Sequence, residues 1–310
     1  MQISTNYLFD RASAQMSQLQ NDLAKSQAQI STQKQVLNPS DAPDQAATIT
    51  RMKSVIGRNE NYAKALDTVQ ARLETESTTL SSASDVLIRI KELAIQASNG
   101  TQGSTSRAAI ATEMKGLRDQ LLSLANSTDT TGNYIFSGSK VKTPAFAANV
   151  NGAVSYQGDQ TRMHVAVGEQ RTIAINRSGS TAFVRVVRTA PDGTNSGTGF
   201  FQAIDDLIAG VKATDGSGGT AMQRGLTEMD ALHQGVVLAQ AEAGTDMKVV
   251  EQQRVVLDDT KLTLKTALSN VEDLDMATAI TQMQKLMLSL EAAQSSFAKV
   301  SQLSLFNYIK

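Results

Sequence analysis

The stretch ATAITQMQKLMLSLEAAQSSFAKVSQLSLFNYIK, residues 277–310, determines how we interpret the rest of this chain. Its apolar side chains recur in alternating steps of three and four residues, at Met283, Leu286, Leu290, Ala293, Phe297 and Val300. This spacing is typical of a coiled-coil seam, which is narrower than the apolar stripe of a helix in a globular core. The stretch therefore predicts a helix whose apolar face needs a partner helix.

The N-terminal forty residues offer that partner, because a similar seam recurs at Leu8, Ala12, Met16, Leu19, Leu23, Ile30 and Leu37. We therefore expect the two termini to pair as a coiled-coil domain formed by residues 1–42 and 272–310. Everything between them is then an insertion into this helix pair.

Composition and charge exclude several classes of partner and site. Only 4% of residues are aromatic, there is no Trp, and Pro occurs four times, which is typical of helical rods. The net charge is −1 and the opposite charges are interspersed, so neither nucleic acid nor anionic lipid is indicated as a partner. The chain has no Cys, which excludes disulfides and thiolate metal sites.

Hydropathy indicates no targeting or membrane segment. Residues 1–10 lack the basic and apolar regions of a cleavable signal, and no apolar run approaches the ~18 residues of a membrane helix. We expect a protein that either stays in the cytoplasm or is exported without a cleaved signal.

Prolines and glycines predict where the helices begin and end. A first helix over about Thr5–Val36 stops at the bend NPSDAP, residues 38–43, and Pro43 restarts the chain in a first helical turn. Residues 44–98 keep a seven-residue apolar period, which predicts one helix roughly 80 Å long. After Asn99–Gly103, a helix from Ser104 or Ser106 should form an antiparallel hairpin with it.

After Asn126 the apolar period changes from helical to two, which predicts strands. The candidate strands are 134–136, 150–154 with an Asn-Gly turn, 164–167, 171–175 and 183–187. We place a β-rich inserted domain at 140–199, closed by the glycine-rich residues 191–199.

Helix is expected again after this insert. A short helix at 200–211 and a flexible segment at 215–219 lead into a long helix from Met222, with a break near 270–275. Residues 43–139 and 200–271 then form a helical rod domain. The predicted fold class is mainly α: an elongated helical rod with paired terminal helices and a small β-rich insert.

No pattern for catalysis, cofactor binding or metal binding is present. His164 lies in a strand pattern and His233 in a helix seam, so a metal site would need both to converge with carboxylates. No nucleophile elbow, Walker loop or dinucleotide fingerprint occurs. The adjacent acidic pairs, such as Asp205-Asp206, are interpreted as solvated helix faces. Met276, Met283 and Met287 fit core packing and an adaptable binding face equally well.

The seams indicate association with other subunits. The tail 303–310 carries large apolar groups, and one antiparallel helix covers only part of such a surface. We therefore expect an assembly interface made by Leu8, Met16, Leu19, Leu23, Ile30, Met283, Leu286, Leu290, Phe297, Val300, Leu303 and Leu305.

Four segments resemble one protein family. MQISTN at 1–6, NPSDAP at 38–43, GNYIFSG at 132–138 and LSLFNYIK at 303–310 are similar, in this order, to the bacterial flagellar hook-filament junction proteins (hook-associated protein 3), relatives of flagellin. The resemblance covers both termini and the flanking helices, and the central insert matches no motif. Ala42 departs from the pattern, where a second acidic residue is expected, and this puts a charge-based role of the bend in doubt.

The resemblance implies a flagellin-like rod that is not an enzyme and has no cofactor. It implies a ring of identical subunits between the hook-side junction protein and flagellin, in the extracellular flagellum. Export would use the flagellar type III apparatus, with a cytoplasmic chaperone on the C-terminal helix. The paired termini would form the inner tube wall, with Leu8, Met16, Leu19, Leu23 and Ile30 facing Met283, Leu286, Leu290, Phe297 and Val300.

Two other interpretations stay open at this point. One is another type III secreted structural protein, such as flagellin or a needle-tip component. The other is an enzyme carried by the β-rich insert, for which loss of an activity on mutation of His164 would be the evidence.

Overall fold

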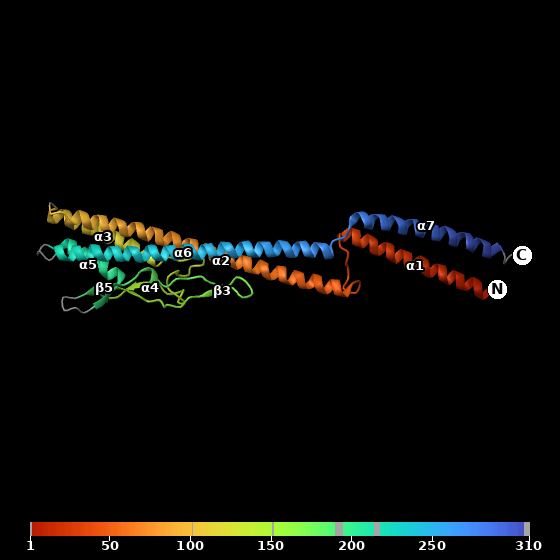
Figure 1. Cartoon of the computed structure of the whole chain (residues 1–310), viewed down its shortest axis with the longest axis horizontal. Coiled ribbons are helices and arrows are strands. Elements are labelled where there is room, and N and C mark those ends of the chain that lie inside the picture. Colours follow the sequence, from red (N-terminus) through yellow and green to blue (C-terminus); the bar gives the residue numbers. More distant parts are fainter. Residues whose placement is uncertain (1, 101, 151, 190–194, 214–217, 307–310) are drawn as a thin grey trace. The chain divides into compact units, whose positions relative to one another are not determined.

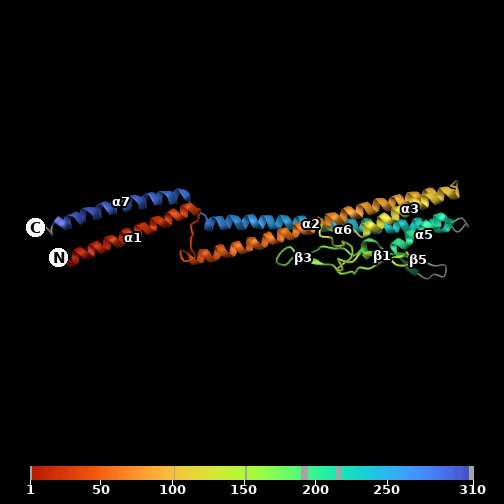
Figure 2. The same ribbon diagram turned by 180° about the vertical axis from the view of Figure 1, so that it is seen from behind.

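The computed structural model describes residues 2–100, 102–150, 152–189, 195–213 and 218–306 (Figures 1 and 2). These residues form seven helices and six short strands, which confirms the mainly helical fold class with a small β-rich insert. The helices are α1 (Gln2–Thr32), α2 (Pro43–Ser98), α3 (Ser104–Ala125), α4 (Gly179–Ala182), α5 (Phe200–Lys212), α6 (Gly218–Glu272) and α7 (Met276–Phe306).

The chain divides into two compact units. The first unit contains residues 1–59 and 258–310, and the second contains residues 60–257. The helices α2 and α6 each contribute to both. The division into a terminal domain (1–42 and 272–310), a rod domain and an insert at 140–199 stays a prediction.

In the first unit, α1 and α7 lie side by side and run antiparallel in both views (Figures 1 and 2). The first helix ends at Thr32, four residues before the predicted end at Val36. Gln33 adopts the left-handed conformation with φ of 57°, which interrupts a right-handed helix. Lys34 instead forms an antiparallel bridge with Asp273. A long-range backbone pairing has replaced the last helical turn.

The predicted start of α2 and the predicted break before α7 are confirmed. Pro43 occupies the first position of α2, where its missing N–H costs no hydrogen bond. The break between α6 and α7 falls at residues 273–275. Asp275 caps α7, because its Oδ1 accepts hydrogen bonds from the backbone N–H of Ala277 at 3.0 Å and of Thr278 at 3.3 Å.

In the second unit, α2 buries one face with a seven-residue period. The buried positions that repeat every seven residues are Leu66, Val69, Leu73, Glu76, Leu80, Ala83, Leu87, Ile90, Ala94 and Ala97, and Arg72, Thr79, Val86 and Leu93 beside them are buried too. The expected hairpin of α2 and α3 is present, and Arg89 of α2 pairs with Glu113 of α3 at 2.8 Å. The short helix predicted at 200–211 is α5, and all of its apolar face is buried.

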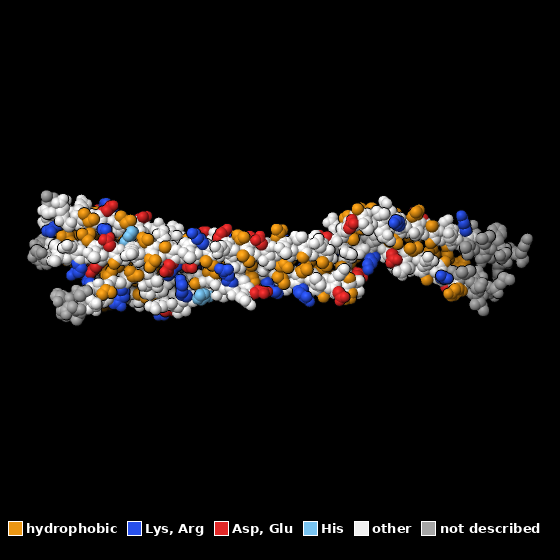
Figure 3. Space-filling model, in the orientation of Figure 1, with side chains coloured by type: hydrophobic (Ala, Val, Ile, Leu, Met, Phe, Trp, Pro, Cys, Tyr) orange, Lys and Arg blue, Asp and Glu red, His pale blue; other side chains and the backbone are white. Residues whose placement is uncertain are grey.

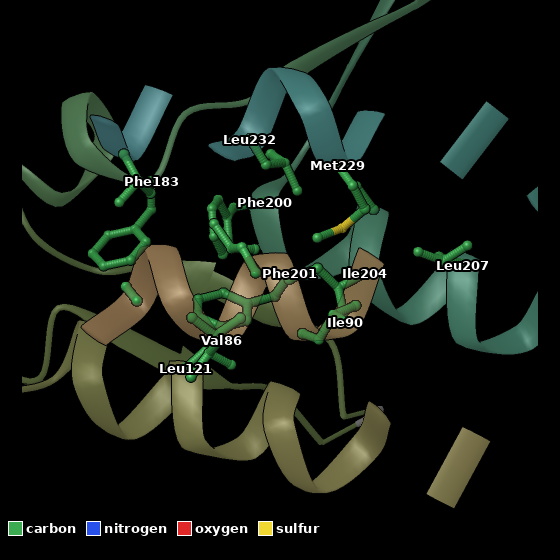
Figure 4. Close-up of a cluster of buried hydrophobic side chains, with 14 of the residues drawn as sticks. Val86, Ile90, Leu121, Phe183, Phe200, Phe201, Ile204, Leu207, Met229 and Leu232 are labelled. Carbon is green, nitrogen blue, oxygen red and sulfur yellow. The ribbon is translucent and has the colours of Figure 1, made fainter. Parts of the chain in front are cut away.

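Aromatic rings fill the space between these helices and the insert. Phe183 packs edge-to-face on Phe136, Phe146 and Phe200, with ring centroids 5.1–5.5 Å apart. Figure 4 shows Phe183, Phe200 and Phe201 between side chains of α2, α3, α5 and α6. Five of the eight Phe residues of the chain are buried here: Phe136, Phe146, Phe183, Phe200 and Phe201.

The insert contains three separate antiparallel strand pairs. They are β1 (Phe146–Ala148) with β2 (Val154–Tyr156), β3 (His164–Ala166) with β4 (Thr172–Ala174), and β5 (Val186–Thr189) with β6 (Asn195–Thr198). The strand predicted at 134–136 is wrong: Tyr134 makes an isolated bridge with Thr128, and the buried Ile135 and Phe136 follow it in a turn. The predicted strand at 183–187 begins only at Val186, because α4 and a bend precede it. Strand β6 was predicted as loop.

The buried Arg177 of the insert forms ion pairs with α2 and α6. Arg177 donates to Glu76 of α2 at 2.7 Å, to Asp246 of α6 at 3.2 Å and to Glu242 of α6. Both Arg177 and Glu76 are almost fully buried, with side chains 3% and 2% exposed. Burial raises the pKa of Glu76, and the charge of Arg177 opposes that rise. Glu76 therefore occupies a core position of the α2 heptad because a charged partner reaches it.

Candidate assembly interface

The terminal helix pair is held at both of its ends. Near the chain termini, the rings of Phe9 on α1 and Phe297 on α7 pack with centroids 4.7 Å apart and an interplanar angle of 67°. At the other end, the backbone bridge between Lys34 and Asp273 joins the segments beside the helices. The expected pairing of the N-terminal and C-terminal helices is therefore present.

The seam between α1 and α7 is only half-buried along its length. Half-buried positions are Met16, Leu19, Leu23 and Ile30 on α1 and Met283, Leu286, Leu290 and Phe297 on α7. Of the α1 and α7 side chains that the structure describes, only Ser26 is buried. Leu8, Val300, Leu303 and Leu305, which the sequence also predicts at the interface, have side chains outside the described part. One partner helix leaves the seam in contact with water.

A groove opens along this seam. It has a volume of about 350 Å³ and is lined by Phe9, Ala12, Gln15, Met16, Ala293, Ser296 and Phe297. Met16 and Phe297, both in the predicted interface, line the same groove, and their role in assembly stays a prediction. Phe9 is absent from the predicted interface, because the apolar spacing of the sequence placed its neighbour Leu8 on the seam instead. The large aromatic side chain of Phe9, next to Leu8 in the sequence, was the feature that could have identified it.

Further apolar side chains of α7 are exposed away from the seam. Ile280 is 40% exposed, Met287 is 44% exposed and Leu288 is 68% exposed. Figure 3 shows apolar side chains at the surface of the terminal helix pair, between acidic and basic ones. Exposed apolar area of this kind on a helix pair is a surface for association. The α1 and α7 pair can therefore bury additional area against another chain.

An ion pair and a hydrogen bond from the backbone hold the loop that follows α1. Lys25 of α1 donates to the carboxylate of Asp41 at 3.0 Å, and Asp41 also accepts from the backbone N–H of Asn38 at 3.3 Å. The hydrogen bond from Lys25 lowers the pKa of Asp41. Asp41 thus provides a charged contact in the bend. It lies next to Ala42, where the family resemblance leads us to expect a second acidic residue.

The two histidines and the acidic pair Asp205 and Asp206 lie on three different elements of the described structure. His164 is exposed on β3, while the Nε2 of His233 lies 2.9 Å from the hydroxyl of Ser84. No group of three His, Asp or Glu in the described part of the chain could hold a metal ion. The pair Asp205 and Asp206 forms ion pairs with Arg118 and Arg188. Among the described helices, none has the length and apolar character needed to cross a membrane.

Comparison with known proteins places both ends of the chain in one family. Residues 3–141 match the bacterial flagellin N-terminal helical region, and residues 226–309 match the bacterial flagellin C-terminal helical region. The chain is 29% identical to flagellar hook-associated protein 3 of Salmonella typhimurium over 316 residues, which cover 99% of each chain.

Several solved structures share the fold, including two from one organism. One is flagellar hook-associated protein 3 from Legionella pneumophila, with a TM-score of 0.66 and 19% identity, covering 72% of this chain and 98% of that one. The other is the flagellar junction protein from the same organism, with a TM-score of 0.58 and 18% identity, covering 66% and 99%. At these identities the likeness concerns the fold alone.

Proposed function

This chain belongs to the bacterial flagellin family, and on that premise we propose that it is a structural subunit of the flagellum that forms the junction between hook and filament. The full-length likeness to a flagellar hook-associated protein supports this role over that of the filament subunit itself. The protein works by assembly and not by catalysis.

The observation that carries this proposal is the half-buried seam of α1 and α7. In a monomer this surface is incompletely covered, whereas packing against neighbouring subunits removes it from water. Each half-buried Leu or Met that becomes fully covered contributes roughly 1 kcal/mol, so many such groups stabilise the assembled form together. The exposed groups Ile280, Met287 and Leu288 of α7 add to this area.

The partners follow from the same role. The subunits form a ring with other copies of this chain. On the side of the hook the ring contacts a hook-side junction protein, and on the side of the filament it contacts flagellin. A cytoplasmic chaperone covers α7 before export, because that helix exposes apolar groups while the protein is unassembled. The protein leaves the cell through the flagellar type III apparatus and functions in the extracellular flagellum.

Deletion of the gene in its native bacterium tests the role. A junction subunit should leave hooks without filaments and release exported flagellin into the medium. Loss of filaments without flagellin in the medium would instead identify the chain as the filament subunit. Normal filaments and motility in the absence of a second copy would refute both roles.

Complementation of the deletion strain tests the interface. Leu290→Asp or Phe297→Asp should be exported yet fail to enter the junction, because each places a charge in the apolar seam. Ser295→Asp is the matched control, since Ser295 is exposed on the same helix. Antibody labelling of purified hooks measures incorporation. Seam variants that enter hooks as well as the control would refute the assignment of this surface.

A further inference from the structure

The two segments that join the terminal helix pair to the rest of the first unit are fastened to each other. After α1 the chain passes through residues 33–42 to α2, and after α6 it passes through residues 273–275 to α7. The backbone N–H of Gln35 donates to the carbonyl of Glu272 at 2.8 Å, and that of Leu274 donates to the carbonyl of Gln33 at 3.0 Å. These bonds join two segments that are far apart in the sequence.

A buried carboxylate sits at this point. The Oε1 of Glu272, whose side chain is 9% exposed, accepts from the Nζ of Lys34 and from the Nζ of Lys53, each at 2.7 Å. Lys34 belongs to the segment after α1, and Lys53 lies on α2. One oxygen atom therefore connects the end of α6, the start of α2 and the segment that follows α1.

The charges at this site depend on one another. Burial alone would raise the pKa of Glu272, but the hydrogen bonds from Lys34 and Lys53 outweigh it and lower the pKa. The hydrogen bond to Glu272 likewise raises the pKa of Lys34. Without the Glu272 carboxylate, the two ammonium groups would stand close together with only the charge of Asp273, which also acts on Lys34, to offset their repulsion, which is unfavourable.

We infer that Glu272 is the positioning residue of the terminal helix pair: its carboxylate, shared by Lys34 and Lys53, holds the two joining segments together and so fixes how α1 and α7 leave α2 and α6. This inference deepens the proposed function, because subunits can interlock through α1 and α7 only when these helices leave the rest of the unit in a defined direction.

Hydrogen exchange of the isolated full chain tests the contact without assembly. In Glu272→Gln, the amides of Gln35 and Leu274 should exchange faster by a factor of up to about five, because a loss of up to about 1 kcal/mol of local stability corresponds to that factor. The matched control is Asp259→Asn, an exposed carboxylate on α6. Unchanged exchange in Glu272→Gln, or an equal change in the control, would overturn the inference.

Double-mutant cycles separate the shared carboxylate from a simple effect on the end of α6. Lys34→Gln and Lys53→Gln should each speed exchange in the wild-type background and have little further effect in Glu272→Gln. Additive effects would mean that each lysine acts independently of Glu272 and would refute the shared contact. Helix content and thermal unfolding, followed by circular dichroism, check that every variant remains folded.

Incorporation into hooks separates this inference from the proposed function. Glu272→Gln should be exported and enter the junction less well than Asp259→Asn. If it exchanges faster but fills junctions as wild type does, positioning by Glu272 is refuted while the junction role stands. If Leu290→Asp also enters junctions normally, the proposed assembly interface is refuted. Hydrogen exchange of Gln35 and Leu274 in Glu272→Gln then still tests whether Glu272 holds the two joining segments together.

Discussion

The α2 segment from Leu66 to Ala97 and the α7 segment from Met283 to Phe297 carry apolar side chains with the same seven-residue period, yet the two are buried very differently. In the second unit Leu66, Leu80 and Ile90 have no exposed surface. In the first unit every seam residue of α7 that the structure describes is half-buried. A heptad pattern thus identifies the helix face that packs against other elements. The number of such elements within the chain determines whether that face is fully buried.

The second unit supplies several partners for each helix. Helices α3, α5 and α6 and the insert contribute side chains to the same core as α2, and aromatic rings fill the gaps. In the terminal pair, α1 packs against α7, and the rings of Phe9 and Phe297 contact each other. The comparison predicts that the second unit is stable in the monomer and that the terminal pair gains most of its stability from other subunits.

The largest expected effect is in the aromatic core. Phe183→Ala removes a ring that is 2% exposed and contacts three other Phe rings. It should lower the free energy of unfolding of the monomer by about 3–5 kcal/mol, because the surrounding core cannot close the cavity. Urea denaturation followed by circular dichroism measures the change. A loss below about 1 kcal/mol would show that this core repacks easily.

A smaller effect is expected in the terminal pair of the monomer. Leu290→Ala should lower the free energy of unfolding by about 1 kcal/mol or less, since Leu290 is already half-exposed and little apolar area is lost. The same variant should reduce incorporation into hooks strongly. A monomer loss as large as that of Phe183→Ala would contradict the distinction between the two units.

The smallest expected effect concerns pH. The pKa of Glu272 is lowered in the folded state, so its contribution is present above the unfolded-state pKa near 4.5 and is lost as pH falls through the lower folded-state value. The contribution is below about 1 kcal/mol because the lysines are half-exposed to solvent. Proteolysis of the terminal helices with an acid-active protease should accelerate in this range in wild type and less in Glu272→Gln. Equal acceleration in both would assign the effect to other carboxylates.

The candidate interface could be predicted from the sequence in outline. The alternating steps from Met283 to Phe297 predicted a helix that pairs with the N-terminal helix, and these helices do pair. That this surface is buried between subunits, and that Leu8, Val300, Leu303 and Leu305 belong to it, stays a prediction. Phe9 was missed, because its contact with Phe297 depends on the register between two helices that are distant in the chain.

What the sequence determined by itself is local: Pro43 begins α2, Asn99–Gly103 separates α2 from α3, and Asp275 caps α7, because backbone geometry and nearby side chains decide these boundaries. The tertiary structure alone decided the rest. It ended α1 at Thr32 and placed Glu76 in the core. It also brought Lys34 and Lys53 to Glu272. Each of these depends on a partner far away in the sequence, whose bonding outweighs the weak local preference of the chain.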